Sequence, residues 1–299
     1  MTAQVLLQPP NRDVSTRSRG MRRGVWIRFV EQRRGMLAAF YLVGLALIAI
    51  LAPVIAPFDP THIDPLNLLA DPFSSKHLLG TDELGRDVLS RLLFAAQISV
   101  VAPLQVIIIS LVLGVIPGLV AGYFSGTSDA IIMRTVDSLQ SIPPLLLAMA
   151  LVAVFGTGLF NAMIAVGIVF TPSIVRVVRA SVLTVRRDQY IEAAVTIGTP
   201  VSTILKRHVM PNIIGPLLVQ SSLMIAFALL AEATLSFIGL GAQPPSASWG
   251  SMLSTGFRML SRQPWLWLWP ALMLSLTVLA WNVVGDTLRN SVGREERKG

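Results

Sequence analysis

The rest of the chain is organised around the segment from Asp188 to Pro211, DQYIEAAVTIGTPVSTILKRHVMP. It is a polar insert between two apolar runs, and its pattern predicts two short helices joined by a sharp turn. Gly198 tolerates the left-handed backbone that ends a helix, and Thr199 with Pro200 fits the N-cap and first position of the next. Pro211 is expected to close the element. The expected apolar faces are Tyr190, Ala193, Ala194 and Ile197 in the first helix and Val201, Ile204, Leu205 and Val209 in the second.

The spacing of the Glu-Ala-Ala triplet, the glycine and the Met-Pro pair resembles the EAA loop of the membrane-spanning subunits of bacterial ABC importers. In that family, the loop is the cytoplasmic helix pair that docks into a groove on the ATPase subunit. Met210 stands where leucine is usual, and His208 where many members have isoleucine. The resemblance implies that the residues coupling this chain to an ATPase are Glu192, Ala193, Ala194, Gly198, His208 and Pro211.

Side-chain size suggests a role for each part of this motif. Glu192 is expected to contact the partner, because it opens the motif on a docking element. Ala193 and Ala194 leave room for close approach, where larger side chains would clash. Gly198 is expected to set the angle between the two helices.

Composition places the chain in a lipid bilayer. Of its 299 residues, 53% are apolar and 13% charged, and the mean hydropathy is +0.67, whereas about 25% of residues are charged in soluble proteins. The net charge of +8 does not indicate nucleic-acid binding, since the basic residues lie beside apolar runs and are not interleaved with aromatic ones. With no cysteine, the chain has no disulfide, thiolate metal site or cysteine nucleophile.

The two ends of the domain are marked by charge. Residues 1–34 contain eight arginines and two acids and are too poor in apolar residues to pack a core, so we interpret them as a cytoplasmic tail. Residues 35–299 would form the transmembrane permease domain. Gly35 to Phe58 carries no charge over 24 residues, longer than the apolar core of a secretory signal, and therefore predicts the first spanning helix.

Residues 57–97 are polar and are expected to lie outside the membrane. Thr81 is a candidate N-cap of an amphipathic surface helix with an apolar stripe at Leu84, Val88 and Leu92. The segment also resembles the GTDxxGRDxxSR signature of peptide-importer permeases. We expect its charged residues to form a local ion-pair network rather than to contact substrate. The matching residues are Gly80, Thr81, Asp82, Gly85, Arg86, Asp87, Ser90 and Arg91.

Two uncharged runs predict the next three spans. Leu92 to Ser128 holds one, roughly Val100 to Gly122, with glycines every four residues (Gly114, Gly118 and Gly122) that would let helices approach closely. Arg134 and Asp137 then mark a short inside loop. The 38 residues from Ser138 to Val175 are too many for one helix, so residues 156–158 are expected to divide them, and Pro143-Pro144 to kink or delay the first part.

The last third of the chain predicts an inside loop, two spans and an outside loop. Residues 180–211 form the cytoplasmic coupling loop, and Asn212 to Leu240 the fifth span. Residues 241–264 form an outside loop rich in Pro and Ser. Trp265, Trp267 and Trp269 then mark a membrane interface, and the sixth span ends near Gly285. In this topology, 19 of the 24 Lys and Arg residues lie inside, as the positive-inside rule requires.

Glu232 is the acid placed well inside a span, which by default makes it a functional candidate. The surrounding AEATLSFIGLG, Ala231 to Gly241, resembles a segment shared by peptide-importer permeases. We expect a structural or gating use in the outer half of the span, where the charge reaches water or a partner subunit. Contact with a substrate amine and proton coupling are the other interpretations.

Several chemistries have no motif in this sequence. It contains no G-x4-G-K-[ST] loop for ATP and no G-x-S-x-G nucleophile elbow. Its three histidines, His62, His77 and His208, are far apart along the chain, which argues against a zinc site. The chain is therefore expected to be a non-catalytic subunit with no cofactor of its own.

We conclude from the sequence that this is an all-α membrane protein with six transmembrane helices. It resembles the type I permeases of ABC importers, closest to the dipeptide, oligopeptide and nickel branch (DppC/OppC type). The resemblance implies a homologous permease partner, two ABC ATPase subunits that hold ATP and Mg²⁺, and an extracytoplasmic substrate-binding protein. It also implies a bacterial inner-membrane location with both termini cytoplasmic.

Peptides are the first choice of substrate, and nickel or a glycoside is the alternative within the family. A secondary transporter working alone and a membrane-embedded enzyme are the alternatives from other classes. The first would need more ionisable residues or broken helices at mid-membrane, and the second a convergent catalytic set.

Overall fold

The computed structural model describes residues 30–73 and 76–296, with side chains up to residue 291. Most of the tail predicted at residues 1–34 thus lies outside the described residues. The described chain is helical, apart from loops and one isolated bridge between Thr81 and Asp87, which confirms the all-α fold. The helices are α2 (Arg33–Ile55), α3 (Val88–Phe124), α4 (Gly126–Gln140), α5 (Pro144–Phe155), α6 (Leu159–Val185), α7 (Gln189–Thr196), α8 (Val201–Ile204), α9 (Met210–Phe237), α10 (Trp249–Arg258) and α11 (Trp265–Glu296).

Within the described residues, five helices are long and apolar enough to cross a membrane: α2, α3, α6, the continuous stretch Val201–Phe237, and α11. A sixth crossing exists if α4 and α5, bent by 91° at the break between them, form one span. The predicted third span corresponds to this bent pair and not to α5 alone, because α5 has only 12 residues. The kink expected at Pro143-Pro144 is confirmed, since Pro143 precedes α5 and Pro144 opens it.

Helices α3 and α6 pack closely through the predicted glycine stripe. A Cβ atom added at Gly118 would lie 2.6 Å from the Cβ of Val178, and one at Gly122 would lie 2.6 Å from that of Val182. Gly167 on α6 is equally close to Ile109 on α3. Only residues without a Cβ atom fit at such positions, so the close helix approach predicted from the sequence is confirmed.

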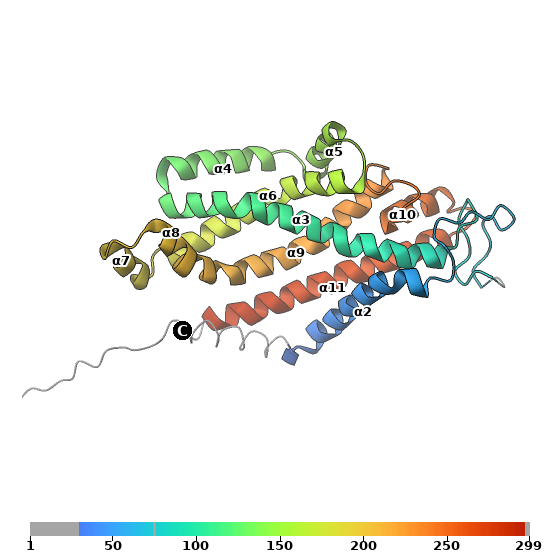
Figure 1. Cartoon of the computed structure of the whole chain (residues 1–299), viewed down its shortest axis with the longest axis horizontal. Helices are drawn as coiled ribbons and strands as arrows, with labels where there is room; N and C mark the ends of the chain where they lie inside the picture. The colour runs from blue at the N-terminus through green and yellow to red at the C-terminus, as the bar shows by residue number, and fades with distance from the viewer. Residues whose placement is uncertain (1–29, 74–75, 297–299) are drawn as a thin grey trace, which may run out of the picture.

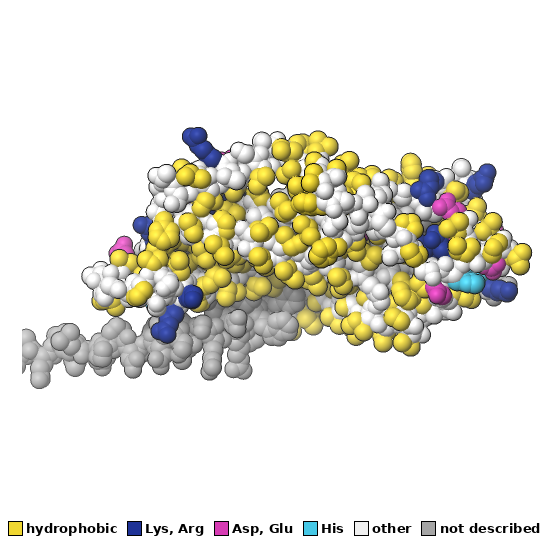
Figure 2. Space-filling view, turned by 45° about the horizontal axis from the view of Figure 1, so that its top comes forward, with side chains coloured by type: hydrophobic (Ala, Val, Ile, Leu, Met, Phe, Trp, Pro, Cys, Tyr) yellow, Lys and Arg dark blue, Asp and Glu magenta, His cyan; other side chains and the backbone are white. Residues whose placement is uncertain are grey.

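The bundle is elongated, and its two ends differ (Figure 1). Residues 56–87 and α10 lie at one end, named here the loop end. Helices α7 and α8 lie at the opposite end, named here the α7 end. Figure 2 shows charged side chains gathered towards the two ends and a broad apolar band between them, the surface expected of a bundle that crosses a bilayer.

The loop end differs from the prediction in where its helix starts. Asp87 is the N-cap of α3, because its carboxylate accepts a hydrogen bond from the Ser90 amide. The Thr81 hydroxyl instead donates to the carbonyl of Asn67 and accepts from the amide of Ala70. The surface helix predicted from Thr81 is therefore wrong, and the loop ends at Asp87 rather than at residue 97.

The predicted outside loop at residues 241–264 contains a helix of its own. Ser248 and Ser251 cap the start of α10 reciprocally. Trp249 is fully buried, and its indole N–H donates to the carbonyl of Leu92 on α3 at 3.3 Å. Helix α10 is therefore tied to the start of α3 and belongs to the packed bundle.

Candidate functional site

Helices α7 and α8 form a hairpin that is packed onto the bundle. Ile191 and Ala194 of α7 and Ile204 of α8 are buried in one apolar cluster with Val178 and Val182 of α6. The buried face of α7 is therefore Ile191 and Ala194. Of the predicted apolar face, Ala194 is buried, whereas Tyr190, Ala193 and Ile197 are exposed. Because the hairpin shares a core with α6, it is packed against that helix and is not a free loop.

A left-handed glycine makes the turn between α7 and α8. Gly198 has a φ of +76°. Its amide donates to the carbonyl of Val195 at 3.0 Å, and the Thr199 amide donates to that of Ala194 at 3.0 Å. This is the Schellman pattern of a helix C-terminus, which confirms the role predicted for Gly198. The predicted Thr199 cap is off by one residue, because Pro200 occupies the N-cap position without a side-chain hydrogen bond.

The helix that begins with α8 continues past Pro211. A π-helical turn, Leu205–Val209, joins α8 directly to α9, and Pro211 lies in the first turn of α9, where its missing amide hydrogen leaves no gap. The prediction that Pro211 closes the element is wrong. The hairpin is therefore continuous with a membrane-crossing helix, Val201–Phe237.

The outward face of α7 carries apolar side chains that no other described residue of this chain buries. Tyr190 is 44% exposed, Val195 54% and Ile197 80%, and Glu192 and Ala193 are exposed beside them. Of the predicted coupling residues, Glu192, Ala193, Gly198 and Pro211 are thus on the surface, His208 is half-buried and Ala194 faces inward. Exposed apolar side chains next to a charge are typical of a surface that meets another protein.

Polar contacts tie α7 to the start of α9. The Asn212 amide donates to the Tyr190 hydroxyl at 3.1 Å and to the His208 carbonyl at 2.6 Å. The Tyr190 and His208 rings lie 6.0 Å apart. Partial burial, together with the nearby Asp188 carboxylate, raises the pKa of Tyr190 to about 12.

Glu232 lies in α9 and is fully buried. Its carboxylate accepts a hydrogen bond from the Ser236 hydroxyl at 2.7 Å, and that hydroxyl accepts one from the Ala242 amide at 2.9 Å. The expectation that this charge reaches water is wrong for the isolated chain. Glu232 instead helps to hold the turn after α9, where a Cβ atom on Gly241 would lie 2.2 Å from the Ser236 hydroxyl.

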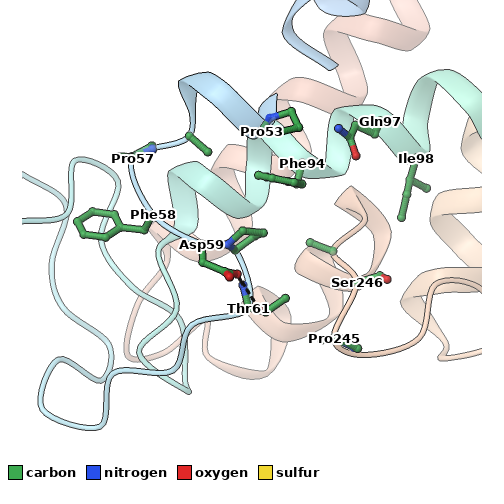
Figure 3. A pocket seen from close by; sticks show the side chains of 13 residues that line it. Pro53, Pro57, Phe58, Asp59, Thr61, Phe94, Gln97, Ile98, Pro245 and Ser246 are labelled. Atoms are coloured by element: carbon green, nitrogen blue, oxygen red, sulfur yellow. Dashed lines mark hydrogen bonds between the residues drawn. The ribbon is translucent and has the colours of Figure 1, made fainter. Parts of the chain in front are cut away.

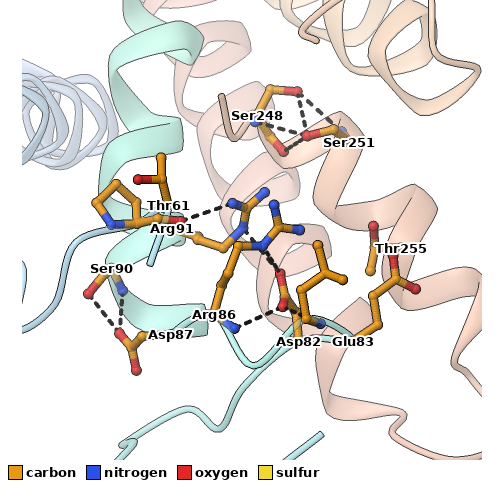
Figure 4. A network of polar contacts seen from close by, with 12 residues as sticks. Thr61, Asp82, Glu83, Arg86, Asp87, Ser90, Arg91, Ser248, Ser251 and Thr255 are labelled. Atoms are coloured by element: carbon orange, nitrogen blue, oxygen red, sulfur yellow. Dashed lines mark hydrogen bonds and ion pairs between the residues drawn. The ribbon is translucent and has the colours of Figure 1, made fainter. Parts of the chain in front are cut away.

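The loop-end signature forms the predicted ion-pair network (Figure 4). Asp82 accepts hydrogen bonds from the Leu84 and Arg86 amides and from the Arg86 guanidinium, the last at 2.8 Å. Arg91 approaches the same carboxylate at 3.5 Å and donates to the Pro60 carbonyl at 3.0 Å. Asp82 and Arg91 are buried, so these charges serve the loop itself, as expected from the sequence.

A second buried carboxylate completes the network. Asp87 pairs with His77 at 2.9 Å and accepts from the Ser90 amide and hydroxyl at 2.8 and 2.7 Å. Gly80 and Gly85 have φ values of +80° and +78°. A Cβ atom on Gly85 would lie 2.0 Å from the Asp64 carbonyl oxygen, so the signature glycines are required by backbone geometry and close approach.

Two ion pairs between α4 and α6 were not foreseen from the sequence. Arg179 donates from Nε and Nη2 to the two carboxylate oxygens of Asp129, and Arg176 donates to Asp137 at 2.6 Å. Asp137 had been assigned to a short loop, whereas it lies on α4, which runs alongside α6 (Figure 1). Arginines three residues apart on α6 are the signal that could have indicated a partner helix. Among the described residues, no group of three or more His, Asp or Glu could hold a metal ion.

Comparison with protein families identifies this architecture. Residues 110–298 match the model of the binding-protein-dependent transport system inner membrane component, and residues 20–72 match the N-terminal transmembrane domain of oligopeptide transport permease C.

Curated relatives match along most of their length. The chain is 38% identical to the glutathione transport system permease protein of Pectobacterium atrosepticum over 97% of this chain and 96% of the relative. It is 37% identical to the dipeptide permease of Haemophilus influenzae, over 89% and 92% of the two chains. It is 43% identical to a probable D,D-dipeptide permease of Escherichia coli, over 85% of each.

A solved structure has the same fold. The inward-facing MetNI methionine ABC transporter aligns with a TM-score of 0.57 and 16% identity, covering 67% of this chain and 96% of that chain. At this identity the likeness concerns the fold alone, and it agrees with the type I permease architecture expected from the sequence.

Proposed function

This chain belongs to the family of binding-protein-dependent transport system inner membrane components. We therefore propose that it is a membrane-spanning subunit of an ABC importer for short peptides, and that ATPase subunits act on it at the α7 end. As a family member it is a multi-pass inner-membrane permease subunit, and ATP hydrolysis belongs to partner subunits. Relatives named for glutathione, dipeptides and D,D-dipeptides support the choice of peptides. Nickel or a glycoside remains the alternative cargo.

The observation that carries the coupling proposal is the apolar surface of α7. Ile197 and Val195 are exposed on a helix whose other face is locked into the core through Ile191. An ATPase subunit covers this surface from the cytoplasm and contacts Glu192. When two ATPase subunits bind ATP with Mg²⁺ and close, the hairpin moves with α6 and α9, and the population shifts between inward-facing and outward-facing pathways.

The other partners follow from this orientation. With the α7 end inside, both termini are cytoplasmic and the loop end faces the extracytoplasmic side. A substrate-binding protein then delivers peptide at the loop end. A homologous permease pairs with this chain, so that the pathway lies between the two subunits. Nothing in this arrangement requires a cofactor bound to the chain itself.

Co-purification of the ATPase subunits with tagged permease tests the coupling proposal. We expect Glu192→Lys and Ala193→Trp to lower the amount of ATPase retained by about tenfold or more, since each places a wrong charge or bulk in a packed interface. Arg262→Glu, an equally exposed charge reversal in the loop before α11, is the matched control and should retain ATPase. Equal retention in all three variants would contradict the α7 surface as the docking site.

Stimulation of ATP hydrolysis in proteoliposomes tests the cargo. With the cognate substrate-binding protein present, dialanine or glutathione should raise the hydrolysis rate, and nickel ions or a glycoside should not. Stimulation by nickel alone would overturn the peptide assignment and leave the coupling proposal standing.

A further inference from the structure

A cavity of about 700 Å³ opens at the loop end between α2, α3 and the segment before α10 (Figure 3). Phe94, Gln97 and Ile98 of α3 form one wall, and the turn from Asp59 to Thr61 and Pro245-Ser246 lie across from it. No residue of this cavity belongs to the coupling hairpin or to the motifs recognised in the sequence.

Several groups that could donate hydrogen bonds into this cavity are absent or already engaged. Four of the lining residues are prolines, which have no amide hydrogen: Pro53, Pro57, Pro60 and Pro245. The amide and the hydroxyl of Thr61 both donate to the Asp59 carboxylate, at 2.7 and 2.6 Å. The Gln97 side-chain amide donates to the Ala49 carbonyl at 2.9 Å. A ligand that donates hydrogen bonds therefore fits this cavity better than one that accepts them.

The charge that lines the cavity also favours a ligand that donates hydrogen bonds, and in particular a cation. The Thr61 hydroxyl and amide lower the pKa of Asp59, so that its carboxylate is ionised at neutral pH. Arg91, a neighbouring cationic group, is already engaged with Asp82 and with the Pro60 carbonyl. The side chain of His62 also lies close to Asp59. Asp59 is exposed rather than buried, so it is accessible to a ligand from solution.

The remaining walls are apolar. Phe94, Ile98 and the proline rings offer surface for a hydrocarbon body, and an aromatic face also attracts a cation. We infer that this cavity binds a primary ammonium group carried on a small apolar body, with Asp59 as the counter-ion. The amino terminus of a peptide and the ethanolamine headgroup of a lipid share this chemistry. The peptide source rests on the proposed function, whereas the ammonium site does not.

Direct binding of phenethylamine tests the site. The full chain, with any subunits that co-purify, is placed in nanodiscs of phosphatidylcholine and phosphatidylglycerol, which contain no primary amine, and bound radiolabelled phenethylamine is counted. We expect Asp59→Asn to raise the dissociation constant by about tenfold or more, since a charge-assisted hydrogen bond is lost. Unlabelled N-acetylphenethylamine should not compete. Asp59→Glu, which keeps the charge, should retain more affinity than Asp59→Asn.

Asp64→Asn is the matched control. Asp64 lies in the same loop, accepts hydrogen bonds from the Leu66 amide and the Asn67 side chain, and also has a lowered pKa through these contacts, yet it does not line the cavity. This variant should bind the probe like the wild type. Equal binding by Asp59→Asn, or equal competition by the acetylated probe, would overturn the inference.

Two competitors distinguish the sources. Displacement of the probe by dialanine would assign the cavity to peptides, and displacement on addition of phosphatidylethanolamine to the nanodiscs would assign it to lipid. Displacement by neither would overturn both of these sources. A failure to co-purify an ATPase would count against the proposed function alone and leave this binding result unchanged.

Discussion

The loop end and the α7 end of this bundle are completed in different ways. At the loop end, the buried carboxylates of Asp82 and Asp87 find their donors within the same chain. At the α7 end, Val195 and Ile197 stand exposed on a helix that is otherwise well packed. The polar groups of the loop end are therefore satisfied within the chain, whereas the α7 end leaves apolar side chains exposed, the surface that we propose an ATPase subunit covers.

Removing Asp82 should have the largest effect on stability. Asp82→Ala leaves Arg86 and Arg91 without their buried partner, so we expect the free energy of unfolding to fall by about 3–5 kcal/mol. Asp137→Ala breaks an ion pair with Arg176 in which both side chains are about half exposed, and should cost about 0–1 kcal/mol. Unfolding of the purified chain in mild detergent, followed by circular dichroism, measures both. Similar losses of unfolding free energy in the two variants would contradict the conclusion that the loop end is stabilised by its own buried ion pairs.

Two isoleucines separate packing from docking at the α7 end. Ile191 is 1% exposed, so Ile191→Ala should lower the free energy of unfolding by about 2–5 kcal/mol. Ile197 is 80% exposed, and Ile197→Ala should change it by less than about 0.5 kcal/mol while reducing ATPase retention. Unfolding and co-purification are measured on the same preparations. Unchanged retention in Ile197→Ala would mean that this exposed side chain is not part of an interface.

Two glycines with similar φ angles, one at each end of the bundle, extend the comparison between the two ends. Gly85 and Gly198 have φ values of +78° and +76°. A Cβ atom on Gly85 would overlap the Asp64 carbonyl, whereas one on Gly198 would meet no atom within 4 Å. Gly198→Ala should therefore cost only the backbone strain of about 1–2 kcal/mol, and Gly85→Ala should cost more. If the two variants unfold alike, the loop end has room to adjust and is less tightly packed than described.

The sequence correctly predicted features that depend on residues close together in the chain. The Gly198 turn, the kink at Pro143-Pro144 and the ion-pair network around Asp82 could all be inferred from residue type and spacing. The start of α3 could not, because both Thr81 and Asp87 have side chains suited to an N-cap. The contacts of Thr81 with residues 67 and 70, distant in sequence, decided between them.

Features that depend on packing between elements were missed for the same reason. Apolar periodicity grouped Tyr190 and Ile197 on one face of α7, but it could not show that the bundle covers Ile191 and Ala194 and leaves Tyr190 and Ile197 exposed. The cavity beside Asp59 brings together α2, α3 and residues 245–247, which no sequence motif connects. Surfaces made by elements far apart in the chain require the fold before they can be recognised.

Titration of Tyr190 should affect stability only at alkaline pH. Its pKa of about 12 exceeds the ordinary value of about 10, because burial and then Asp188 disfavour the phenolate. A raised pKa of this kind stabilises the folded chain fully below about pH 10, and the contribution is lost as the pH rises to about 12. Relative to Tyr190→Phe, the wild type should lose stability only in that window. Subtracting the ultraviolet titration of the variant, which keeps two of the three tyrosines, isolates Tyr190. A midpoint near 10 would show a hydrated phenol and a more open α7 end than the packing of Asn212 against it indicates.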